Sequence, residues 1–306
     1  MKWTDSGNGL GHPYELESQG TVIAGGGWAG DKEYSSLVFL REPRQFASSL
    51  DFALIQAAKD GDPKKMKMAL EMGADPNFAW TSSGQEGSAL HALIQEGRGQ
   101  RQKCFELLLP VADLAMRNVV GHTPLMSAVI YKPAEWAAAI IERSDGLAQD
   151  DGGMTALMHA ACRGLAKTAQ AILSKSDPMA RNNTGETALM LAAETACGES
   201  DRVVEMLVGC SDARAKDHFG RDAMMRAAKR DNSESHPGFL ALMAASDPFA
   251  CDKMGLDAVF FEKSSRTKFN NKGSTPVAHW VKREQERREL ATLVPAASAQ
   301  GQKPRL

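Results

Sequence analysis

The chain has 306 residues, of which 43% are hydrophobic, and its formal net charge is −2. The apolar content permits a folded core, and the near-neutral charge argues against a protein that binds nucleic acid along its whole length. Only 6% of the residues are aromatic. The core must therefore be built from Ala, Leu and Met, which favours closely packed helices over sheets.

Two similar stretches lie 32 residues apart and organise the sequence. Residues 153–161 read Gly-Met-Thr-Ala-Leu-Met-His-Ala-Ala, and residues 185–193 read Gly-Glu-Thr-Ala-Leu-Met-Leu-Ala-Ala. Apolar residues recur in the same frame on both sides, 32 to 36 residues apart, at Leu54, Leu90, Leu125, Leu157, Leu189, Met224 and Val259. Such a period, with small residues at fixed offsets, is typical of an array of helix pairs.

These residues resemble the ankyrin repeat, whose pattern Gly-x-Thr-Pro-Leu-His-x-Ala-Ala is most nearly matched at Gly121-His122-Thr123-Pro124-Leu125-Met126-Ser127-Ala128. The resemblance implies an all-α solenoid of six or seven repeats over residues 48–260, with short β-hairpin tips. In the family, the histidine after the leucine forms hydrogen bonds within and between repeats. Here it survives only at His91, and Ile or Met elsewhere implies adaptable apolar packing instead.

Residues 1–47 are rich in Gly, Ser and Pro and differ from the repeats. Two β-prone runs, residues 20–24 and 36–40, flank a loop with Gly25, Gly27 and Gly30 at the Gly-x-Gly-x-x-Gly spacing. In dinucleotide-binding folds a helix opens at the third glycine, whereas here a β-prone run soon follows. The segment therefore predicts a β-hairpin that caps the array, with a loosely ordered leader as the alternative.

Residues 261–306 hold ten Lys or Arg and only four Asp or Glu. We expect a basic linker over 261–274, a capping helix over 275–294 and a disordered tail over 295–306. Thr275 would be the N-cap of that helix and Pro276 its first residue. The basic residues could contact nucleic acid, but the interleaved acidic residues favour a solvated helix.

The sequence gives no sign of secretion or of a membrane anchor. The five cysteines form no Cys-x-x-Cys pair, so reduced, structural thiols are expected. The first residues lead into no apolar signal-peptide core, and no apolar stretch is long enough to cross a bilayer. We therefore expect a cytoplasmic protein, with leaderless secretion as an effector left open.

No catalytic, cofactor-binding or metal-binding residues are expected. The seven histidines form neither a His-Glu-x-x-His motif nor a zinc spacing with cysteine, and Gly-x-Ser-x-Gly and P-loop motifs are absent. We therefore predict that the chain is not an enzyme. The alternative is an enzyme that binds a nucleotide at the glycine-rich loop of residues 25–30.

The ankyrin resemblance implies a protein partner that binds the hairpin tips and the groove of the inner helices. Carried over by position, the candidate partner-binding residues are His122, Met154, His159, Glu186, Phe219, Arg221 and Arg226. The last three rank first, because exposed Phe and Arg at adjacent sites often form interface hot spots. The alternative for Phe219 is a ring folded back onto the neighbouring hairpin. We thus expect a monomeric interaction protein, a scaffold, inhibitor or effector whose partner the sequence does not name.

Overall fold

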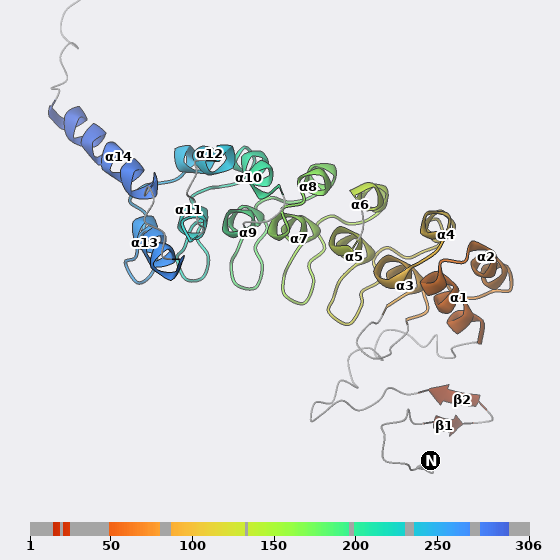
Figure 1. Cartoon of the computed structure of the whole chain (residues 1–306). Helices are drawn as coiled ribbons and strands as arrows, with labels where there is room; N and C mark the ends of the chain where they lie inside the picture. Colours follow the sequence, from red (N-terminus) through yellow and green to blue (C-terminus); the bar gives the residue numbers. More distant parts are fainter. Residues whose placement is uncertain are drawn as a thin grey trace, which may run out of the picture. The chain divides into compact units, whose positions relative to one another are not determined.

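The computed structural model describes residues 15–18, 21–24, 49–79, 87–131, 134–195, 199–229, 236–269 and 276–293. From Ser49 onward, the described residues form successive pairs of short helices joined by loops (Figure 1). The all-α fold of paired helices predicted from the sequence is confirmed. The chain divides into two compact units, residues 1–145 and residues 146–306, and each is described by itself.

The first unit contains a small sheet and helix pairs. Its described elements are β1 (Glu15–Ser18), β2 (Thr21–Ala24), α1 (Ser49–Asp60), α2 (Pro63–Glu71), α3 (Ala89–Glu96), α4 (Arg101–Leu108), α5 (Pro124–Tyr131) and α6 (Ala134–Ile141). The inner helices α1, α3 and α5 pack in succession, and α2 packs against α4 in an outer layer. Between α4 and α6, Trp136 stacks on Phe105 with ring centroids 4.1 Å apart. Packing of one helix pair on the next buries the apolar faces that a single helix pair leaves open.

The second unit continues the same arrangement. Its described elements are α7 (Ala156–Cys162), α8 (Ala166–Leu173), α9 (Ala188–Glu194), α10 (Ser200–Val208), α11 (Ala223–Ala227), α12 (Pro237–Ala245), α13 (Ala258–Phe269) and α14 (Pro276–Leu293). The inner helices α7, α9, α11 and α13 pack in succession, and so do the outer helices α8, α10 and α12. Among the helices of the described ranges, none has the length and apolar character needed to span a membrane.

The inner helices α7, α9 and α11 of the second unit begin with the same type of N-cap. There the side chain accepts a hydrogen bond from the backbone N–H three residues on, which satisfies a group that has no partner within the helix. The pairs are Thr155 with Met158, Thr187 with Met190, and Asp222 with Met225. These methionines replace the family's histidine, and all three are buried. The apolar packing expected from that replacement is what the structure shows.

The sheet of the first unit pairs two segments near the N-terminus. The run expected over residues 20–24 forms β2, which pairs antiparallel with β1 so that Glu15 lies opposite Ala24. The sequence analysis did not single out β1, although Glu-Leu-Glu-Ser alternates polar and apolar residues as a strand does. The second expected run, residues 36–40, and the glycine-rich loop lie outside the described residues.

The basic linker expected over residues 261–274 is partly helical. α13 continues to Phe269, and residues 270–275, including the expected N-cap Thr275, lie outside the described residues. The buried carboxylate of Glu262 on α13 accepts hydrogen bonds from the backbone N–H groups of Val277 and Ala278 at 3.1 and 3.2 Å. Glu262 therefore caps α14 from the preceding helix. The sequence analysis predicted a linker because the segment is polar, and it did not predict this tertiary contact.

Gly238→Ala is expected to destabilise the second unit by about 1–3 kcal/mol. Gly238 lies in the first turn of α12, and a Cβ there would lie 2.3 Å from the carbonyl oxygen of Asp201 on α10. That oxygen is backbone, so the two helices would have to separate. The control is Gly209→Ala, whose Cβ would meet nothing closer than the Met206 carbonyl oxygen at 3.6 Å. Equal urea midpoints for the two variants would contradict this packing.

Candidate functional site

Each hairpin tip of the second unit is closed by an Asp or Asn side chain. The Oδ1 atom of Asp217 accepts hydrogen bonds from the backbone N–H groups of Phe219 at 2.8 Å and Arg221 at 2.9 Å. The same two bonds, to residues two and four positions later, recur at Asp150, Asn182 and Asp252. The sequence analysis missed this set, although an Asp or Asn recurs at this position with the repeat period.

Backbone hydrogen bonds join each tip to the next one. They run from Asn183 N–H to Gly152 O, from His218 N–H to Thr184 O, and from Lys253 N–H to Phe219 O, each at 3.0 Å. Neighbouring hairpins approach each other closely at Gly185. Its φ is 79°, and a Cβ there would lie 2.6 Å from the His218 ring. The tips are therefore fixed relative to one another within this unit.

The third and fourth tips of the second unit present large apolar side chains to solvent. Phe219 is 58% exposed and Met254 is 81% exposed. The Arg221 guanidinium lies over the Phe219 ring, 4.6 Å from its centroid, and its Nε donates to Asp217 Oδ2 at 2.9 Å. Phe219 therefore stands out from the tip instead of folding back onto the neighbouring hairpin. Phe219 and Arg221, two of the candidate contact residues, therefore lie side by side on this tip.

The candidates on the first tip of this unit are half-buried. The Nδ2 of Asn182 lies 3.5 Å from the Sδ of Met154. The ring of His159, on α7, lies against the hairpin, with its Nε2 2.8 Å from Asp150 Oδ2. These two side chains hold their own repeat and its neighbour together, and they offer less surface than Phe219 and Met254 do.

Arg226 is not the exposed contact residue that the sequence analysis expected. It is 2% exposed and donates hydrogen bonds to three carboxylates, those of Asp217 at 2.7 Å and of Glu186 and Glu194 at 2.5 Å. A buried guanidinium persists only when it is paired. The carboxylates come from two repeats, up to 40 residues away in the sequence, so sequence position alone suggested an open surface. Glu186, another candidate, is engaged in the same way.

The ion cluster, which we define as Glu186, Glu194, Asp217, Arg221, Arg226 and Lys229, holds three cations and three anions. Its remaining pairs join Arg221 Nε to Asp217 Oδ2 at 2.9 Å and Lys229 Nζ to Glu194 Oε1 at 3.3 Å. Burial raises the pKa of Asp217, but hydrogen bonds from Arg226, Arg221 and Phe219 outweigh it and lower that pKa below its ordinary value. Asp217 is therefore ionised at neutral pH.

The same balance applies to two other members of the ion cluster. Burial raises the pKa of Glu186, but the Asn182 amide and the Arg226 charge lower it overall. Burial disfavours the charged form of Arg226, yet its carboxylate partners raise the pKa above its ordinary value. The cluster ties two hairpins to α9 and α11, which positions the third tip.

In the first unit, His91 performs the role that the family resemblance implies. Its Nε2 donates to the carbonyl oxygen of His122 at 3.1 Å, and its Nδ1 accepts from the N–H of Ser88 at 3.3 Å. Burial lowers the pKa of His91 to about 4, although the bond to His122 opposes that shift. His122 itself is half-buried in a hairpin closed by Asn118 Oδ1 at 2.8 Å. The backbone carbonyl of His122 therefore links its hairpin to the preceding repeat.

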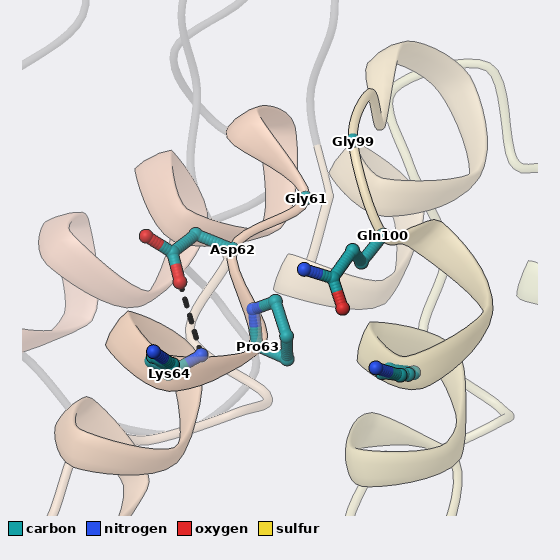
Figure 2. A pocket seen from close by; sticks show the side chains of 7 residues that line it. Gly61, Asp62, Pro63, Lys64, Gly99 and Gln100 are labelled. Carbon is teal, nitrogen blue, oxygen red and sulfur yellow. Dashed lines mark hydrogen bonds between the residues drawn. The ribbon is translucent and has the colours of Figure 1, made fainter.

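An open hollow of about 550 Å³ lies between the loop that joins α1 to α2 and the loop that joins α3 to α4 (Figure 2). It is lined by Gly61, Asp62, Pro63, Lys64, Gly99, Gln100 and Lys103. The Asp62 carboxylate already caps α2 by accepting from the N–H of Lys64 at 3.0 Å. The lining offers two lysine ammonium groups and a carboxylate that is already used as a helix cap, so we assign no chemistry to it.

Residues 137–211 match the sequence model of the ankyrin repeat family in three copies. Residues 137–211 of the chain are therefore ankyrin repeats. No curated protein matches it. The helix pairs and hairpins on both sides of the matched residues follow the same plan, with the inner helices and tips in the same order. Ankyrin repeats are generally modules that bind other proteins and usually carry no catalytic activity.

Proposed function

We propose that this chain binds a protein partner through the hairpin tips of its second unit, with Phe219, Arg221 and Met254 as the central contacts. The supporting observation is the pair of large apolar side chains on adjacent tips. A soluble protein gains nothing for its own stability from such exposure, and aromatic and arginine side chains are enriched among interface hot spots.

The rigidity of the third tip supports this proposal. The backbone of Phe219 is bonded on both sides, through its N–H to Asp217 and through its carbonyl to Lys253. The Arg221 guanidinium is bonded to Asp217 and stacked on the ring. Because little side-chain freedom is left to lose on binding, contact with this pair should retain most of its favourable free energy.

The ion cluster supplies a fixed polar border to the same surface. Glu194 and Lys229 are its most exposed members, and they pair with each other. A partner's polar groups could meet them at the rim without opening the buried bonds of Arg226. We therefore propose that Arg226 stabilises the third tip and does not contact the partner. If the bound surface of the partner is its functional surface, this protein would act as a regulator or inhibitor.

The test is affinity capture from native lysate with quantitative mass spectrometry, comparing wild type with Phe219→Ala/Met254→Ala. Because both side chains are exposed, the variant should fold normally, and circular dichroism checks this. Loss of hot-spot contacts typically weakens binding by at least about 2 kcal/mol, or roughly 30-fold. We therefore expect a protein captured by wild type to disappear from the variant.

The control for this test is Met68→Ala. Met68 is 61% exposed but lies on the outer helix α2, away from any tip. Capture should be unchanged in this variant. A protein captured equally by all three forms would contradict the assignment of the interface to the tips, and loss in both variants would indicate a nonspecific apolar effect.

A further inference from the structure

The outer helix α12 differs from other outer helices in being apolar on every side. Its sequence, Pro-Gly-Phe-Leu-Ala-Leu-Met-Ala-Ala, contains no polar side chain. Phe239, Leu242 and Met243 are buried against the repeat stack. Pro237 and Ala244 are nevertheless exposed, and Leu240 is 49% exposed. Helices that are apolar all round are normally buried, so this outer face lacks the cover that its composition calls for.

The neighbouring outer helices of the second unit show the usual pattern. The exposed face of α8 carries Lys167 and Gln170, and that of α10 carries Arg202 and Glu205. The apolar face of α12 is therefore a local departure from an otherwise polar outer surface. It lies on the side of the repeats opposite the inner helices, so the tip surface described above does not explain it.

Charges of opposite sign border this apolar face. α12 packs on α10, and α14 contacts the turn after α12, where the Arg288 guanidinium lies 4.3 Å above the Phe249 ring. In Figure 1, α12 lies between α10 and α14. On α10, Arg202 pairs with Glu199, whereas Glu205 makes no ion pair within the described part of the chain. On α14, Lys282, Arg287 and Arg288 pair with glutamates, and Arg283 makes none within those residues.

We propose that α12 is the centre of a two-fold contact between two copies of this chain. A two-fold axis parallel to α12 and in the contact plane would lay α12 on α12 of the other copy. It would also place α10 of each copy against α14 of the other, with Glu205 facing Arg283 of the partner subunit. An apolar centre flanked on one side by the acidic Glu205 and on the other by the basic Arg283 is self-complementary under this symmetry.

The size of the surface indicates a weak dimer. A helix of nine residues is about 13 Å long, so α12 alone is far smaller than the roughly 800 Å² per partner of a standard interface. Contact along α10 and α14 enlarges it toward that range and brings the charged borders together. This arrangement leaves the hairpin tips free, so the dimer would present two partner-binding surfaces.

Sedimentation velocity of the 306-residue chain over a concentration series tests the proposal. Wild type should shift from monomer to dimer as concentration rises. Leu240→Glu buries one carboxylate from each copy without a partner and should weaken dimerisation by about a hundredfold. Met68→Glu, the same kind of change at an exposed position of α2, should leave dimerisation unchanged.

Charge reversal tests the geometry of the contact. Glu205→Arg and Arg283→Glu should each weaken the dimer, and the combined variant should restore it, because each copy then offers the reversed pair to the other. A wild type that stays monomeric throughout would overturn the proposal, as would a Leu240→Glu dimer of wild-type affinity. A monomer that self-associates only after removal of residues 294–306 would identify that tail as the cover of α12 and also overturn it.

Discussion

Arg226→Met is expected to lower the unfolding free energy of the second unit by about 3–5 kcal/mol at neutral pH. The substitution keeps an unbranched stem but removes the only cation that contacts all three carboxylates of the ion cluster. Asp217 and Glu186 would then be negative, close together and largely removed from water. The loss comes from these uncompensated charges more than from the missing hydrogen bonds.

The pH dependence of the Arg226→Met effect identifies its electrostatic origin. In wild type the pKa values of Asp217 and Glu186 are lowered by folding, so their contribution is present above the unfolded-state pKa and lost as pH falls through the folded-state pKa. In the variant the Arg226 guanidinium no longer opposes burial, although the contacts from Arg221, Phe219 and Asn182 remain. Protonation of these carboxylates then relieves the repulsion. The difference between wild type and variant should therefore shrink as pH falls below about 4.

Urea unfolding of wild type, Arg226→Met and Arg202→Met at pH 7 and in acid measures these differences. Arg202 is an exposed arginine that pairs with Glu199 at 3.3 Å on α10, so its loss should change stability by less than about 1 kcal/mol. If the Arg226 and Arg202 variants lost the same stability, the ion cluster would have no special role. A loss in the Arg226 variant that does not depend on pH would point to packing instead of charge.

Acidification from pH 7.5 to pH 4.5 is expected to remove about 2.5 kcal/mol of stability from the first unit through His91 alone. The pKa of this group is about 4 in the fold and 6.5 as the ordinary value. Between these two values the unfolded chain binds a proton that the folded chain does not, so stability rises with pH. Protonation would also turn Nδ1 into a donor that faces the N–H of Ser88.

Comparison of wild type with His91→Gln isolates this contribution from that of the carboxylates. The variant should be less stable at pH 7.5, because it loses a buried pair of fitted hydrogen bonds, but it should lose less stability on acidification. Urea titrations at pH 7.5 and 4.5 give both differences. Parallel losses in the two proteins would show that His91 is accessible to protons in the folded state.

The fold was predictable because it repeats. Leucines, small residues and capping hydroxyls recur every 32 to 36 residues, and each helix pair depends mainly on its sequence neighbours for burial. Thr155 and Thr187 cap their helices through groups three residues away. Phe219 was predictable as an exposed tip residue for the same reason, since its position within its own hairpin decides its exposure.

The sequence by itself thus determined the helix pairs, their period and the residues that form each tip, because these depend on contacts within one repeat or with the next. Only the tertiary structure decided the role of Arg226, because the carboxylates of Glu186 and Glu194 approach it from another repeat. It also decided that Glu262 caps α14 and that the apolar face of α12 meets solvent. Burial and charge pairing depend on which side chains meet in space, and the position of a residue within its repeat does not fix that.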